Sequence, residues 1–140
     1  MGEKDRVKKA VLDTNIVASA LLFGGEPARL TALSQNGQIE WLASAAIIQE
    51  YTRVLAYPKF SLTEAEIREL LNEDILPFIT AVRVGKVPAV IRQDPSDDHF
   101  LACALAGKAD VVVSGDHHLL DLGAYHGIPI VNAKTFLKEF

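Results

Sequence analysis

The chain has 140 residues, which is enough for one domain with a sizeable core and too few for two. Apolar residues make up 49% and charged residues 23%, so the composition excludes a disordered polymer, and no apolar run approaches the roughly 18 residues of a membrane span. The balance of 14 basic and 18 acidic residues, a net charge of −4, excludes broad, tight binding to nucleic acid through a basic surface. The polar first residues and the single cysteine, Cys103, predict a cytoplasmic protein without a secretory leader, so we expect one domain over residues 1–140.

Strands and helices are predicted to alternate along the chain. Short apolar runs predict strands at 7–12, 39–42, 82–84, 109–114 and 128–131. Helices are expected at 15–23, from Pro27 to Asn36, from Ser44 to Pro58, from the capping box Thr63–Glu66 to Ile75, from Ser96 or Asp97 to Ala106, and after Asn132. Residues 87–93 are expected to form a connection. This order predicts an α/β fold, a three-layer α/β/α sandwich around a central, mainly parallel sheet of four to five strands.

Four acidic residues stand where these elements reach one edge of the predicted sheet. Asp13 and Asp116 follow apolar strands, Asp98 lies at the start of a helix, and Glu50 borders the apolar stripe of its helix. An open parallel sheet presents its reactive groups at the carboxyl ends of its strands. Carboxylates gathered there repel one another unless a cation or a proton relieves them. We therefore predict a site for Mg²⁺ or Mn²⁺, which take oxygen ligands, and chemistry on a phosphodiester.

Four motifs in this order and spacing resemble those of a PIN domain, the nuclease fold of many prokaryotic toxins and RNA-processing factors. Val11-Leu12-Asp13-Thr14-Asn15-Ile16-Val17 resembles the first motif, with Ser19 one helical turn beyond. Glu50, Asp98 and Ser114-Gly115-Asp116 resemble the later ones. Segments 27–30, 51–55 and 127–131 resemble a subgroup of bacterial and archaeal proteins, the PIN toxins of toxin–antitoxin systems.

The resemblance implies a metal-dependent endoribonuclease that cleaves single-stranded RNA and leaves a 5′-phosphate and a 3′-hydroxyl. The implied catalytic residues and ligands of Mg²⁺ or Mn²⁺ are Asp13, Glu50, Asp98 and Asp116. The residues expected to support these ligands or a water are Asn15, Ser19, Ser114 and Asp97. The implied partners are an antitoxin and a second copy of the chain, without membrane contact.

Each acid also has a purely structural interpretation. Asp13 is a suitable helix cap, and the helix dipole favours Asp97 and Asp98 at the start of their helix. Asp116 fits a Gly-Asp turn, and Glu50 alone is typical of a solvated helix face. The functional prediction therefore depends on all the acids together.

Other function classes remain open. The main alternative is a catalytically inactive PIN-like module that binds RNA or protein. A phosphatase with Asp13 as nucleophile is disfavoured, because Asn15 stands where a second Asp is needed. A dinucleotide-binding fold is disfavoured, because no Gly-x-Gly-x-x-Gly follows the first strand. The pair His117-His118 lacks Cys partners and a spaced second pair, so we expect surface residues there, not a zinc site.

Overall fold

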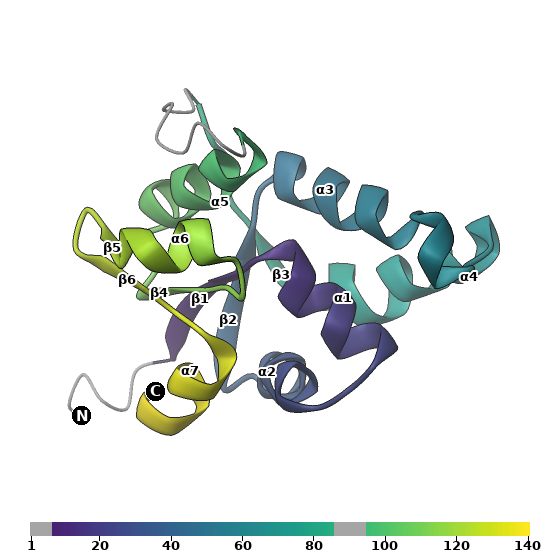
Figure 1. The fold of residues 1–140 in the computed structure, drawn as a ribbon, viewed down its shortest axis with the longest axis horizontal. Coiled ribbons are helices and arrows are strands. Elements are labelled where there is room, and N and C mark those ends of the chain that lie inside the picture. The colour runs from purple at the N-terminus through teal and green to yellow at the C-terminus, as the bar shows by residue number, and fades with distance from the viewer. Residues whose placement is uncertain (1–6, 86–94) are drawn as a thin grey trace.

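A computed structural model describes residues 7–85 and 95–140 (Figure 1). The elements in chain order are β1 (Lys8–Leu12), α1 (Thr14–Leu22), α2 (Glu26–Gln35), β2 (Ile39–Ala43), α3 (Ala45–Leu55), η2 (Pro58–Phe60), α4 (Glu64–Leu70), η3 (Leu71–Ile75), η4 (Leu76–Phe78), β3 (Ile79–Ala81), α5 (Pro95–Ala106), β4 (Val111–Val113), α6 (His117–Leu122), β5 (Ala124–Tyr125), β6 (Ile128–Val131) and α7 (Ala133–Glu139). The predicted connection 87–93 lies outside the described residues.

The sheet has the strand order β3-β2-β1-β4-β6-β5, and every pair is parallel except β5 with β6. This arrangement confirms the predicted α/β fold with a mainly parallel sheet. The sheet has six strands, however, and the predicted four to five was wrong by one. The additional strand, β5, has only two residues, too few for a periodic pattern, and it turns into β6 through His126 and Gly127, both at positive φ.

The strand predicted at 82–84 is displaced towards the N-terminus, and β3 covers Ile79–Ala81 instead. Its partner β2 ends at Ala43, where Ser44 starts the next helix, so residues beyond Val82 have no ladder to join. The Val82 N–H still donates to the Ala43 carbonyl at 3.0 Å. The apolar alternation at 82–84 therefore lies just past the end of the ladder.

Local side-chain caps start several helices as predicted. Ser44 accepts the N–H of Ile47, Asn132 accepts the N–H of Thr135, and Thr63 with Glu66 forms a complete capping box. Helix α5 differs, because it begins at Pro95 and not after a Ser96 or Asp97 cap. Proline suits the first turn of a helix because its missing N–H would have no partner there.

Helices cover the sheet in layers (Figure 1): α5 packs on β1, β2 and β4 from one side, while α2 and α7 lie together on the other. The core centres on the fully buried strand Val111–Val113 and on Trp41. Burial raises the pKa of the Cys103 thiol to about 11, which fits a core residue.

The carboxyl end of β1 is held by a buried polar contact. The Tyr51 hydroxyl donates to the Leu12 carbonyl at 2.6 Å and accepts the Trp41 Nε1–H at 3.2 Å. Leu12 precedes Asp13, so this contact fixes the strand where it delivers its acid.

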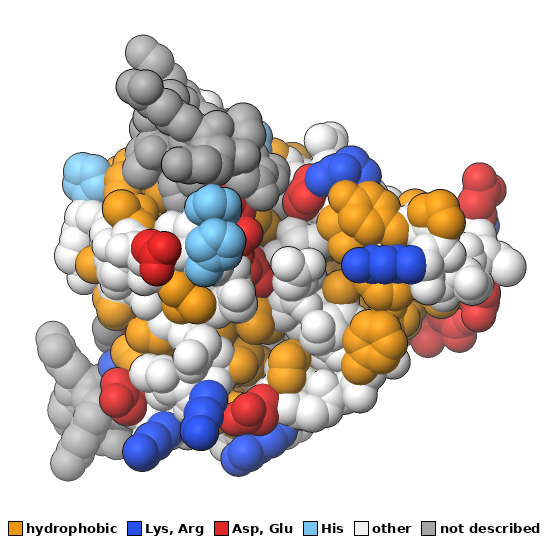
Figure 2. Space-filling model, in the orientation of Figure 1, with side chains coloured by type: hydrophobic (Ala, Val, Ile, Leu, Met, Phe, Trp, Pro, Cys, Tyr) orange, Lys and Arg blue, Asp and Glu red, His pale blue; other side chains and the backbone are white. Residues whose placement is uncertain are grey.

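Acidic side chains gather over α4 at one end of the molecule (Figure 2). Within residues 7–85 and 95–140, no single helix is long and apolar enough to cross a membrane, although α1 and α2 reach that length and composition as a pair bent by 93°.

Candidate active site

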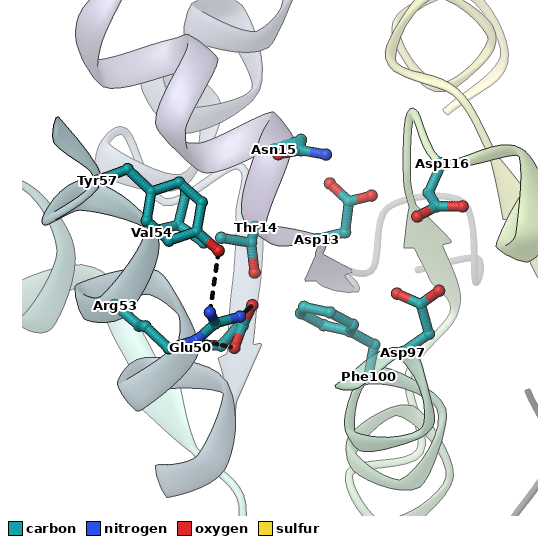
Figure 3. A pocket seen from close by; sticks show the side chains of 10 residues that line it. All are labelled: Asp13, Thr14, Asn15, Glu50, Arg53, Val54, Tyr57, Asp97, Phe100 and Asp116. Atoms are coloured by element: carbon teal, nitrogen blue, oxygen red, sulfur yellow. Dashed lines mark hydrogen bonds and ion pairs between the residues drawn. The ribbon is translucent and has the colours of Figure 1, made fainter. Parts of the chain in front are cut away.

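A cavity of about 200 Å³ opens where the carboxyl end of the sheet meets the ends of four helices (Figure 3). Carboxylates from separate parts of the chain face one another across it. Its lining residues are Asp13, Thr14, Asn15, Glu50, Arg53, Val54, Tyr57, Asp97, Phe100 and Asp116. Three of the four predicted acids, Asp13, Glu50 and Asp116, are thus brought together.

Asp13 is the most enclosed acid of the cavity, at 3% exposure. Its Oδ1 accepts the Ile16 N–H at 2.9 Å, so it does cap α1. Its Oδ2 accepts a short hydrogen bond from the Ser114 hydroxyl and one from the Gly115 N–H at 3.2 Å. Burial raises the pKa of the Asp13 carboxyl, these hydrogen bonds lower it in part, and the nearby Asp116 raises it further. Capping α1 leaves Asp13 acceptor positions for further partners, since a carboxylate has about four.

Ser114 links two of the acids. While its hydroxyl donates to Asp13, its Oγ accepts the Asp116 N–H at 2.9 Å. Asp116 caps α6 by accepting the His118 N–H at 2.7 Å, and its carboxylate faces the cavity (Figure 3). Ser114, which was predicted to support the ligands, therefore lies in direct contact with Asp13.

The third acid of the cavity is Asp97. Asp97 and Asp98 are both buried, at 4% and 5% exposure, in the first turn of α5. Consecutive helix residues point about 100° apart, so the two carboxylates leave the helix in different directions. Asp97 lines it, and its carboxylate points towards those of Asp13 and Asp116 (Figure 3), whereas Asp98 is not among the lining residues. The sequence-based assignment of Asp98 as ligand and Asp97 as support remains a prediction that this placement does not favour.

Glu50 reaches the cavity from α3 and is held by Arg53. Arg53 Nη2 lies 2.6 Å from Glu50 Oε1, and Arg53 Nε lies 3.1 Å from Oε2, which makes a bidentate pair. Arg53 Nη1 also donates to the Tyr57 hydroxyl at 2.9 Å. The Arg53 side chain is 58% exposed, so solvent weakens this pair and leaves Glu50 able to exchange partners.

Polar residues of α1 complete one wall. The Thr14 hydroxyl oxygen is buried, lines the cavity and has no hydrogen-bond partner among the described residues. Asn15 lines the cavity together with Asp13 (Figure 3), and its supporting role stays a prediction. Ser19 is not among the lining residues, and its carbonyl accepts the N–H groups of Phe23 and Gly24 at the end of α1. Sequence reasoning missed Thr14, although it stands inside the first motif, and Tyr57, which lies beyond the end of α3.

Two histidines flank the acidic wall. Ligand atoms of Asp116, His117 and His118 lie within 4.8 Å of one another. The two imidazole rings are 4.1 Å apart between centroids, at the rim of the site.

The donor set suits a hard divalent cation. Four carboxylates and an orphaned hydroxyl offer oxygen atoms only, which Mg²⁺ and Mn²⁺ prefer. A buried carboxylate with a raised pKa beside other acids is also relieved by such an ion. The residues present therefore fit Mg²⁺ or Mn²⁺.

Fold and site together define an α/β protein with a carboxylate-lined cavity at the carboxyl edge of a parallel sheet. The sequence model of the PIN domain family matches residues 9–118, and the chain belongs to this family. PIN domains are generally nucleases and typically use divalent metal ions.

Solved structures have a similar fold. PAE2754 from Pyrobaculum aerophilum shares 15% identity over 94% of this chain and 88% of that chain, with a TM-score of 0.62. FitAcB from Neisseria gonorrhoeae shares 20% identity over 89% of this chain and 98% of that chain, with a TM-score of 0.57. At these identities the likeness concerns the fold. No curated protein is significantly similar in sequence.

Proposed function

We propose that this protein is a Mg²⁺- or Mn²⁺-dependent endoribonuclease that cleaves single-stranded RNA. We also propose that residues 1–140 form one domain, which carries the whole active site. The observation that carries the proposal is the convergence of Asp13, Asp97, Asp116 and Glu50 on one cavity. These acids come from four elements far apart in the sequence, and their mutual repulsion would destabilise a protein with no use for a cation. Membership of the PIN domain family supports the same conclusion.

We assign the ion to Asp13, Asp97 and Asp116. A bound divalent ion supplies positive charge that offsets the phosphate and the charge developing on the leaving oxygen. The three hydrogen bonds that Asp13 accepts hold its carboxylate in a fixed orientation towards the cavity. Such support reduces the reorganisation needed when substrate arrives.

Glu50 is assigned to the attacking water. It lies across the cavity from the aspartates (Figure 3), where one of its carboxylate oxygens can accept a proton from a water in line with the phosphodiester. Thr14 and Asn15 offer a hydroxyl and an amide to orient that water or the phosphate. Attack of that water at phosphorus breaks the bond to the 3′-oxygen, which leaves and takes up a proton from solvent, so the products carry a 5′-phosphate and a 3′-hydroxyl.

A cleavage assay tests this function. It uses the purified chain, an unstructured oligoribonucleotide, and Mn²⁺ or Mg²⁺. We expect cleavage with either ion, none in EDTA, and none by Asp13→Asn. Matched single-stranded DNA and duplex RNA report the substrate class. Absence of cleavage by the metal-loaded wild type would favour the inactive binding module, and full activity of Asp13→Asn would refute the role of Asp13.

The resemblance to PIN toxins supports a role as the toxin of a toxin–antitoxin pair. We propose a cognate antitoxin and a homodimer as partners, and the cytoplasm, where RNA is accessible, as the compartment. Growth arrest on expression, relieved by co-expression of a neighbouring small reading frame, tests the antitoxin. Light scattering after size exclusion tests the dimer.

A further inference from the structure

We propose that a strip of aromatic and basic side chains beside the cavity binds the RNA strand, stacking its bases and contacting its phosphates. We call this surface the aromatic–basic strip, and its members are Phe23, Arg53, Tyr57, Lys59 and Phe60. The proposal rests on the proposed function, because it describes how substrate reaches the acidic site. In Figure 2, basic and apolar side chains alternate along one line over the end of α3 and the turn that follows.

The strip is continuous with the acidic cavity. Arg53 and Tyr57 line the cavity itself, and the Arg53 guanidinium lies over the Tyr57 ring, 5.6 Å from its centroid. The Phe60 N–H donates to the Tyr57 carbonyl at 3.0 Å, so the chain turns and presents Lys59 and Phe60 directly beyond Tyr57. A strand that leaves the cavity over Tyr57 therefore meets the rest of the strip next.

Its outer end is an aromatic pair, Phe23 and Phe60, of which Phe23 is exposed and Phe60 is half-buried. Phe23 is 74% exposed, the highest value among the exposed large apolar side chains of the described residues. Its ring lies 6.1 Å from that of Phe60, centroid to centroid, with 53° between the planes. Lys59 Nζ lies 5.1 Å from the Phe60 centroid. Exposed aromatic faces beside a cation suit nucleic-acid bases, which stack on any aromatic ring regardless of sequence.

Backbone geometry fixes the strip in place. Phe60 belongs to the 3₁₀ turn η2, which starts at Pro58 and ends at Ser61 in the left-handed region, with φ of 52°. Phe23 ends α1, and its N–H donates to the Ser19 carbonyl at 2.9 Å. A fixed backbone avoids the cost of ordering a loop on binding, so the positions from which these side chains project are set before a ligand arrives.

Charge favours RNA over an apolar peptide as the occupant. An apolar segment would leave Lys59 without an anionic partner and would remove its ammonium from water, which is unfavourable. A single RNA strand supplies both components, since its phosphates pair with cations while its bases cover the rings. The chain carries a net charge of −4 and Arg53 is paired with Glu50, so Lys59 supplies much of the positive charge with which the strip meets phosphates.

Fluorescence anisotropy of a labelled, unstructured oligoribonucleotide tests the strip, with the full chain in EDTA so that binding is read without cleavage. We expect Phe23→Ala and Phe60→Leu each to raise Kd by roughly 5- to 150-fold, the range for losing one stacked base. Phe23→Tyr keeps a ring and should keep the affinity. Lys59→Gln should raise Kd and reduce the slope of log K against log salt by about 0.7.

Matched controls lie on α7. Phe140 is 44% exposed and its ring stacks on Phe136 at 5.3 Å, so Phe140→Ala removes a comparable exposed ring far from the strip. Lys134→Gln removes a comparable exposed charge. Both controls should leave Kd unchanged, and thermal melting confirms that each variant folds.

Two results would overturn the strip. One is a wild-type Kd for both Phe23→Ala and Phe60→Leu, which would also be the result if the surface instead served a peptide partner. The other is an equal loss of affinity in the α7 controls. Neither result tests the proposed nuclease function, since cleavage by the wild-type chain with Mn²⁺ is measured separately. A chain that binds RNA through the strip but never cleaves it would refute the nuclease function alone.

Discussion

Replacing Tyr51 by phenylalanine removes one oxygen atom from the centre of the protein and keeps the ring. In the wild type this oxygen donates to the Leu12 carbonyl at 2.6 Å and accepts the Trp41 Nε1–H at 3.2 Å. All three groups are buried, so water cannot replace the lost partner. Burial also raises the pKa of the Tyr51 phenol, so the hydroxyl remains a donor wherever the protein is folded.

The cost follows from the two groups left behind. A buried donor or acceptor without a partner costs about 1–3 kcal/mol. The Trp41 N–H is a donor that loses its acceptor and bears the full penalty. The Leu12 carbonyl loses one donor but keeps a second lone pair for another. We expect Tyr51→Phe to lower the free energy of unfolding by about 2–4 kcal/mol, which for a chain of this length lowers Tm by about 8–16 °C.

Urea and thermal denaturation measure this loss, and Tyr57→Phe is the matched control. The Tyr57 hydroxyl accepts a hydrogen bond from the exposed Arg53 guanidinium, and water can replace this partner, so its removal should cost less than about 0.5 kcal/mol. Tyr51→Phe should also slow cleavage, because Leu12 leads into Asp13. Equal stability of the two variants would refute the idea that this hydroxyl holds the end of β1.

Three further predictions concern the acids and the core. In EDTA, Asp13→Asn should melt at a higher temperature than the wild type by a margin that grows as the pH rises above the ordinary carboxyl pKa of 3.8. Burial raises the pKa of Asp13 in the folded protein, so the unfolded chain ionises first and the folded wild type loses stability as the pH rises. Excess Mn²⁺ should make the wild type melt at the higher temperature, since an ion at a hundred times its Kd stabilises it by about 2.7 kcal/mol. A difference in melting temperature that does not change with pH in EDTA would contradict the reasoning. Asp97→Asn should reduce single-turnover cleavage and Mn²⁺ affinity by at least about 100-fold while Asp98→Asn retains both, and the opposite order would restore Asp98 as the ligand. Gly107→Ala should lower the free energy of unfolding by about 1–3 kcal/mol in urea denaturation, because its Cβ would lie 2.9 Å from Leu42 Cδ1 and 3.1 Å from the Cys103 carbonyl oxygen. The control Gly85→Ala should be neutral, because an added Cβ there has no atom within 4 Å. A similar loss of stability in Gly85→Ala would exclude the steric cause.

Local chemistry made much of the fold predictable. The caps at Ser44, Thr63 and Asn132 depend on neighbouring residues only, so the sequence alone locates them. The buried runs that became β1 and β4 were recognisable for the same reason. The strand at 82–84 was misplaced because its register depends on where the partner β2 ends, which is a property of two distant segments. The hairpin of β5 with β6 likewise depends on a partner.

The sequence predicted which elements supply acids to the cavity. It was less able to predict which residue of each element lines it. Glu50 was expected at the border of its apolar stripe, and it lines the cavity there. The choice between Asp97 and Asp98 depends on where α5 starts. It starts at Pro95, which is two residues earlier than a Ser96 cap predicts and three residues earlier than an Asp97 cap predicts. Tyr57 reaches the cavity only because the chain turns at Pro58, which no periodicity beyond the helix end reveals.

Ser114 has a mechanical consequence for the aspartates. An amide N–H occupies one lone pair of its Oγ, so its own proton is directed to Asp13 and the direction of the bond is fixed. The loop after β4 is thereby clamped to the loop after β1, and a displacement of one moves the other with it. The backbone of Asp116 is consequently held at a fixed position relative to the carboxylate of Asp13.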